Sequence, residues 1–175
     1  MADSFKVRVW AVLGGGKTGK STVIGNLTSR LGKGRGAVLS LVALRGGGYL
    51  QICARRQSLQ EAGRSPEDVV RDAQRVARGL QKKEALSNCY LNLLIAIRID
   101  ATRSLPPASD YLSHFIKSGW SLESLVILDF DAKKHSRYFT FGAPTYELYG
   151  ASNMAQNNSK HQQLVGQVRN HFGWA

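Results

Sequence analysis

A glycine-rich stretch between an apolar segment and a helical one constrains the fold of this chain more than any other feature. The sequence LGGGKTGKST (residues 13–22) fits the pattern G-x-x-x-x-G-K-[ST] from Gly14 to Ser21. The residues before it, FKVRVWAVL (5–13), predict a buried strand, and KSTVIGNLTSRLGKG (20–34) carries apolar residues at helical spacing. Because this pattern binds phosphate only between a strand and a helix, the context predicts a phosphate-binding loop.

The residue types in the loop suit the phosphates of a nucleotide. Glycines let backbone N–H groups turn inward around phosphate oxygens, the amino group of Lys20 offers a positive charge, and the hydroxyl of Ser21 can bind Mg²⁺. We therefore expect a nucleotide and Mg²⁺ as cofactors. The candidate cofactor-binding residues are Gly14, Gly15, Gly16, Lys17, Thr18, Gly19, Lys20, Ser21 and Thr22. The alternative is a glycine-rich turn that binds nothing.

Mg²⁺-dependent hydrolysis also needs an acidic residue at the end of a neighbouring apolar strand. The segment SLVILDFDA provides Asp129 and then Asp131, and the segment LNLLIAIRID ends at Asp100. Each of these residues can also be an ordinary aspartate at the end of a strand. The candidate catalytic residues are Lys20 and Asp129, and the candidate metal ligands are Ser21 and Asp129.

The remaining sequence alternates between strand and helix patterns. AVLSLVAL (37–44) predicts a second strand, which with the first strand and helix predicts a right-handed βαβ unit with parallel strands. Further strands are predicted at 91–99 and 122–130, with a last short strand at 138–142 or 144–148. Further helices are predicted at 64–83, 107–119 and 157–172.

This alternation continues without a linker, a repeat or a low-complexity segment, which predicts one domain over residues 1–175. The expected fold is α/β: a three-layer, P-loop NTPase-like sheet of about five mostly parallel strands flanked by helices. No N-K-x-D guanine-binding motif occurs, which disfavours an ordinary GTPase. No run of about 18 apolar residues occurs either, so no membrane span is expected.

The charge of the chain predicts a polyanionic partner. The net charge is +12, and no acidic residue occurs between Asp3 and Glu61. Such a basic chain favours nucleic acid or an acidic membrane surface. The candidate nucleic-acid contacts are Arg71, Arg75, Arg78, Lys82, Lys160 and Arg169, of which the first four recur at helical spacing. The alternative for that stripe is a solvated helix face.

Four segments resemble ParA/MinD-type partition ATPases, a P-loop family with a deviant loop. Residues 7–56 are similar to the family's opening strand, loop, helix and second strand, and the later similar segments are 65–80, 93–104 and 141–168. This chain has Gly15 at the position of the family's extra lysine, and Ala43 and Arg45 at the positions of two acidic residues.

The resemblance implies ATP as the nucleotide and a weak, switch-type ATPase that takes part in plasmid or chromosome partition or in cargo positioning. It implies sequence-indifferent DNA binding, a nucleotide-dependent homodimer and a stimulating adaptor protein. It also implies a cytoplasmic location, associated with the nucleoid if the source is bacterial. Two cysteines in unrelated contexts, Cys53 and Cys89, agree with buried thiols in a reducing cytosol.

Two other functions stay open. The first is a small P-loop kinase, in which the paired arginines Arg55 and Arg56 would clamp phosphates. The second is a hydrolysis-deficient P-loop module that binds DNA or acts as a scaffold, which the acid-free first third of the chain favours.

Overall fold

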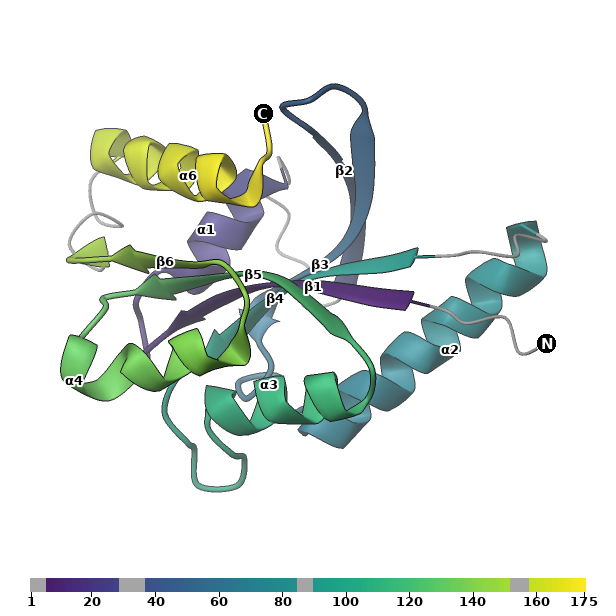
Figure 1. The fold of residues 1–175 in the computed structure, drawn as a ribbon, viewed down its shortest axis with the longest axis horizontal. Helices are drawn as coiled ribbons and strands as arrows, with labels where there is room; N and C mark the ends of the chain where they lie inside the picture. Colours follow the sequence, from purple (N-terminus) through teal and green to yellow (C-terminus); the bar gives the residue numbers. More distant parts are fainter. Residues whose placement is uncertain (1–5, 29–36, 85–89, 152–157) are drawn as a thin grey trace.

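A six-stranded sheet with helices on both faces forms the centre of the molecule (Figure 1). The computed structural model describes residues 6–28, 37–84, 90–151 and 158–175. The strands lie in the order β2-β3-β4-β1-β5-β6. Their bounds are β1 Lys6–Gly14, β2 Ala37–Ala43, β3 Tyr49–Ser58, β4 Tyr90–Arg98, β5 Ser121–Leu128 and β6 Thr145–Leu148.

The helices form the two outer layers, which confirms the expected three-layer α/β fold. They are α1 Lys20–Leu27, α2 Pro66–Glu84, α3 Ala108–Lys117, α4 Ala132–His135 and α6 Asn158–Phe172, with a 3₁₀ helix η1 at Ser136–Phe141. Helices α1 and α6 lie on one face of the sheet, and α2 and α3 lie on the other (Figure 1).

The buried central strand β1 supplies apolar side chains to both layers. Trp10 and Val12 belong to the core beneath α1 and α6, whereas Val9, Ala11 and Leu13 belong to the core above α2 and α3. This division follows from the two-residue period of a strand, because successive side chains point to opposite faces. A parallel strand covered on both faces is apolar almost throughout, which explains the run in the sequence.

The predicted parallel βαβ unit is wrong. In the described part of the chain, β2 has β3 as its one partner strand and is antiparallel to it, while the parallel neighbours of β1 are β4 and β5. The cause is a tight turn at residues 44–48, where Gly47 and Gly48 have φ values of +91° and +83°. The Leu44 N–H donates to the Gly48 carbonyl at 3.1 Å, so the chain folds back as a hairpin instead of crossing the sheet.

The sequence analysis missed β3 altogether, so the sheet has six strands rather than about five. Its second half, Arg55–Ser58, lacks apolar alternation and does not read as a strand by composition. Pairing holds it in place, because Cys53, Ala54 and Arg55 lie beside Leu93–Ile95 of β4.

The other predicted elements occur close to their expected positions. The last strand is β6, at the second of the two predicted sites, whereas residues 138–142 belong largely to η1. Helix α2 begins with reciprocal bonds, as the Asp68 N–H donates to Ser65 Oγ and the Ser65 N–H donates to Asp68 Oδ2. The first helix ends at Leu27, and residues 29–34 of its predicted range lie outside the described residues.

Among the helices of the described ranges, none is long and apolar enough to cross a bilayer.

Candidate functional site

The glycine-rich loop leaves the sheet at its centre. It follows Gly14 at the end of β1, with β4 on one side and β5 on the other, and it opens directly into α1 at Lys20. The Ile99 N–H donates to the Gly14 carbonyl at 3.1 Å, which ties the start of the loop to the end of β4. The carboxyl ends of parallel strands at the centre of an α/β sheet are where such folds bind ligands.

The loop backbone turns sharply at two residues. Lys17 and Gly19 have φ values of +59° and +86°, and Gly19 caps α1 without a side-chain hydrogen bond. A non-glycine residue such as Lys17 adopts this conformation rarely and at a cost of about 1–3 kcal/mol. Left-handed residues in such a turn bring successive N–H groups to one concave side, which suits an anion.

Lys20 holds its ammonium group inside the loop. Its Nζ donates to the Gly14 carbonyl at 3.0 Å, to the Gly15 carbonyl, and to Thr18 Oγ1 at 3.5 Å. The side chain is only 4% exposed, and burial lowers its pKa to about 8. The charges of Glu61 and Asp100 raise that pKa and the charge of Arg98 lowers it. A buried ammonium whose three donors all meet neutral oxygens is well placed to accept an anionic ligand instead.

Steric crowding explains the glycine at the start of the loop. A Cβ atom on Gly14 would overlap Thr18 Oγ1, and Thr18 is buried and donates to the Gly15 carbonyl at 3.2 Å. A Cβ on Gly16 would lie 3.3 Å from the Arg98 guanidinium, so that guanidinium packs directly against the loop. On Gly15 a Cβ would meet only ordinary contacts.

Arg98 is a site residue that the sequence analysis missed. Its backbone is clamped by Gln60, whose Nε2 donates to the Arg98 carbonyl and whose Oε1 accepts from the Arg98 N–H, both at 2.9 Å. Glu61, next to Gln60 in the turn after β3, is the other site residue that the sequence analysis missed. Arg98 is the last residue of β4 and Glu61 follows β3, both at the carboxyl edge of the sheet. Glu61 could have been found only if β3 had been recognised.

The candidate acidic residues occupy the same edge but differ in their relation to Lys20. Asp100 follows β4, and its charge raises the pKa of Lys20. Asp129 follows β5, has a φ of +54° and is not among the charges that shift the pKa of Lys20. Asp131 caps α4 by accepting from the Lys133 N–H at 3.0 Å. Within the part of the chain that the structure describes, no three His, Cys, Asp or Glu side chains gather as a metal site.

Ser21 and Thr22 lie in the first turn of α1, as a phosphate-binding loop requires. The Arg56 guanidinium donates to the Ser21 carbonyl at 3.5 Å and lies against Gly25 of the same helix. A Cβ on Gly25 would come within 2.9 Å of Arg56 Nε, so α1 sits close to β3 at this glycine. Arg56 therefore helps to hold the helix that begins at the loop.

The candidate nucleic-acid contacts do not form one surface. Arg71 and Arg75 are exposed on α2, where they pair with Asp68 at 3.2 Å and Asp72 at 3.6 Å. Arg78 lies further along α2 with its Nε on the Gln74 carbonyl, and the side chain of Lys82 lies outside the described part.

The other two candidates lie on α6, across the sheet from α2 (Figure 1). Lys160 is exposed near the start of that helix. Arg169 points inward, and its guanidinium donates to the carbonyls of Asn26 at 3.0 Å and Leu27 at 3.4 Å. It therefore satisfies the carbonyl end of α1, a structural contact that accounts for an arginine here.

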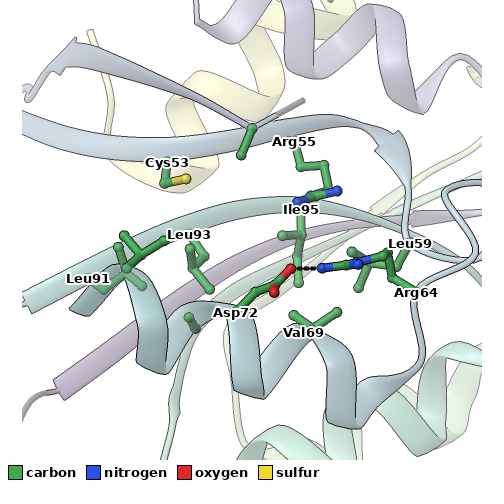
Figure 2. A pocket seen from close by; sticks show the side chains of 12 residues that line it. Cys53, Arg55, Leu59, Arg64, Val69, Asp72, Leu91, Leu93 and Ile95 are labelled. Carbon is green, nitrogen blue, oxygen red and sulfur yellow. Dashed lines mark ion pairs between the residues drawn. The ribbon is translucent and has the colours of Figure 1, made fainter. Parts of the chain in front are cut away.

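A separate cavity lies between α2 and the strands β3 and β4 (Figure 2). Apolar side chains from β4 form much of its wall, the Arg64–Asp72 ion pair lies across it, and Cys53 faces it. Burial raises the pKa of the Cys53 thiol. The cavity volume of about 70 Å³ is below the roughly 150 Å³ that accommodates benzene, so it is too small for a nucleotide.

Comparison of this chain with family models, with curated proteins and with solved structures finds no match. The fold and the site therefore define the class: a three-layer α/β protein with a glycine-rich loop, a buried lysine and nearby carboxylates at the carboxyl end of its central strand.

Proposed function

We propose that residues 14–22 bind the phosphates of ATP together with Mg²⁺. The observation that carries this proposal is the buried ammonium of Lys20, held by oxygens of the loop at the carboxyl end of β1. Phosphate oxygens are charged acceptors, and a bond from an ammonium to a charged acceptor is stronger than a bond to a carbonyl. Ligand phosphates would therefore replace the carbonyls as partners of Lys20.

The neighbouring residues have separate parts in this proposal. The Ser21 hydroxyl and the Asp100 carboxylate would hold Mg²⁺, with Asp129 as the alternative carboxylate. When bound, Mg²⁺ neutralises charge on the β and γ phosphates. One carboxylate is enough in such a site, because Mg²⁺ keeps several waters and shares the phosphates as ligands. Arg98, packed against Gly16, would bring a second positive charge to the phosphates.

We further propose that the nucleotide controls non-specific DNA binding, in a ParA-like role in partition or cargo positioning. The support is the net charge of +12, the exposed arginines of α2 and the resemblance of the sequence segments. This role includes weak ATP hydrolysis, a stimulating adaptor protein, a nucleotide-dependent homodimer and a cytoplasmic, nucleoid-associated location. Phosphate contacts carry no sequence information, so binding would be sequence-indifferent and sensitive to salt.

Calorimetric titration with ATP–Mg²⁺ tests the phosphate site. We expect Lys20→Ala to weaken binding by about 10- to 100-fold, because it removes a charge-assisted bond worth about 1.5–3 kcal/mol. The matched control is Lys117→Ala, which removes an exposed lysine at the end of α3. If Lys20→Ala binds ATP as tightly as the wild type, the loop is not a phosphate site.

DNA binding at two salt concentrations tests the wider role. Purified protein is titrated with ATP–Mg²⁺, with ADP–Mg²⁺ and with neither. Binding that requires ATP supports a partition-type switch, whereas strong binding in all three states supports the hydrolysis-deficient DNA-binding or scaffold module. Absence of DNA binding in every state contradicts both.

A second candidate function is phosphoryl transfer to a small acceptor, and the position of Arg98 favours it. Its guanidinium lies against the loop, where an arginine can stabilise charge that develops on a transferring phosphoryl group. Such a kinase would show Arg98→Ala losing turnover with nearly unchanged ATP affinity. If Arg98→Ala leaves the turnover rate unchanged, the kinase function is excluded.

A further inference from the structure

Within the described residues, the edge of the sheet formed by β2 lacks the charges, prolines and bulges that usually protect an edge strand. Strand β2 is outermost, and its sequence AVLSLVA (37–43) contains no charged residue and no proline. It pairs with β3 over seven consecutive residues without a bulge. Exposed, regular and apolar edges of this kind tend to pair with another strand.

Among the described residues, the backbone groups on the outer side of β2 are paired only at the end of the strand. At its end, the Ala43 carbonyl accepts from the Ala175 N–H at 2.9 Å, and the Arg45 N–H donates to the Gly173 carbonyl at 3.1 Å. Ala43 and Arg45 therefore direct these backbone groups away from β3. Because the direction alternates along an antiparallel strand, the backbone groups of Leu39 and Leu41 also point away from β3. Among the described residues, no strand or loop pairs with this side of residues 38–42.

The side chains of the same residues form an exposed apolar face. Leu39 is 47% exposed and Leu41 is 68% exposed, and Tyr49 at the other end of the hairpin is 75% exposed. Three large apolar side chains on one hairpin are more than the single scattered ones that surfaces normally carry.

We propose that β2 pairs antiparallel with β2 of a second copy of this chain, about a two-fold axis through Ser40. The sequence AVLSLVA reads the same in both directions from Ser40. In this register Leu39 faces the partner's Leu41, and Val38 faces the partner's Val42, so every cross-strand pair within residues 38–42 joins side chains of equal size. Leu39 and Leu41 of both subunits then cover one another, and four backbone hydrogen bonds form between the outward groups.

Charge restricts where a second copy can bind, and β2 is a suitable place. Each chain carries a net charge of +12, so two copies repel over most of their surfaces. The uncharged strand lets the backbones meet without bringing basic side chains into the contact. A strongly acidic partner would instead bind the basic surfaces elsewhere.

This contact does not depend on the proposed nucleotide site, because β3 and β4 separate β2 from the loop strand β1. A pair of short strands buries less than the roughly 1,200 Å² of a standard interface. We therefore expect a dissociation constant on the order of 10–100 µM, with or without nucleotide.

Sedimentation velocity of the full chain without nucleotide, from about 5 to about 500 µM, tests the proposal. We expect a monomer that converts to a dimer and to nothing larger. Leu41→Lys places like charges beside the axis and should leave the protein monomeric. The matched control is Ile116→Lys, which adds the same charge at an exposed apolar residue of α3 and should dimerise normally. A monomeric wild type, a ladder of larger species, or a dimeric Leu41→Lys overturns the proposal.

Disulfide trapping tests the register. In a chain carrying Cys53→Ser and Cys89→Ser, Ser40→Cys should form a disulfide dimer on mild oxidation, because residues at the axis have Cα atoms about 4.5–5.5 Å apart. Val38→Cys should not, since two copies of residue 38 would lie about 13 Å apart. Failure of Ser40→Cys to cross-link, or equal cross-linking of both variants, overturns the two-fold pairing.

Discussion

Lys20 combines the position and the charge that a phosphate site needs, and its burial makes that charge sensitive to pH. Burial lowers its pKa to about 8 in the free protein, and the charges of Glu61 and Asp100 only partly oppose this. The residue is therefore mainly protonated at pH 7 and mainly neutral near pH 10.

This titration predicts how ATP affinity depends on pH. Bound phosphate holds the proton on Lys20, so the pKa of the complex is higher than that of the free protein. Affinity should be full below pH 8 and should fall by up to about tenfold per pH unit as the pH rises above 8. Calorimetry from pH 7 to about pH 10 measures this fall. Lys20→Arg, which stays charged throughout, is the control and should show a flat profile; a wild-type profile equally flat contradicts the role of Lys20.

Substitution can distinguish the two candidate carboxylate ligands of Mg²⁺, Asp100 and Asp129. The charge of Asp100 raises the pKa of Lys20, so we expect Asp100→Asn to weaken ATP–Mg²⁺ binding by about tenfold and Asp129→Asn to leave it unchanged. Titration in excess EDTA should abolish the difference, because only the metal-dependent part of the affinity is affected. The opposite order of the two variants would assign the metal to Asp129.

Helix α2 is the element that presents basic side chains most regularly. Arg71 and Arg75 are 64% and 75% exposed, and each pairs with an acidic residue three positions earlier. Exposed pairs of this kind contribute about 0–1 kcal/mol, so they do not prevent the arginines from turning to DNA phosphates.

The double variant Arg71→Glu with Arg75→Glu should weaken DNA binding and flatten its dependence on salt. Each lost phosphate contact lowers the slope of log K against log salt by about 0.9. The matched control, Lys133→Glu with Lys134→Glu, makes the same change of charge within α4. An unchanged slope for the α2 variant means a solvated helix face, and equal flattening by both variants means diffuse attraction.

At the scale of the whole molecule, the C-terminal residues join the α6 layer to the end of β2. Trp174 is 1% exposed and packs against Trp10 of β1 and Phe172 of α6, with ring centroids 5.9 and 4.9 Å away. It also forms a β-bridge with Leu44. One residue thus contacts the first strand and the last helix by its side chain and the end of the β2 edge by its backbone.

Trp174→Ala should lower the free energy of unfolding by about 3–5 kcal/mol, because it leaves a large cavity at this junction. Urea unfolding followed by circular dichroism measures the change. Ile116→Ala removes an exposed apolar side chain and should change stability by less than about 0.5 kcal/mol. A loss for Trp174→Ala no greater than that of the control would show that the C-terminal residues do not hold the layers together.

Sequence alone was sufficient wherever the signal is local. The apolar run before Gly14, the loop spacing and the helical spacing after Lys20 are contained in residues 5–27, and the structure has the strand, loop and helix there. Ser65 and Asp68 likewise specify the start of α2 within four residues. Such features depend on the two- and 3.6-residue periods of the backbone, which a single sequence displays directly.

Tertiary structure alone decided the strand order and which charged residues lie near Lys20. Nothing in residues 37–58 shows that β2 turns back on β3 at the edge, or that β4 reaches β1 by pairing Lys6 with Tyr90. The charges of Glu61, Arg98 and Asp100 act on Lys20 only because three strands end at one edge of the sheet. Which distant residues pair depends on the apolar surface that each arrangement of whole layers buries. No single stretch of sequence determines that burial free energy.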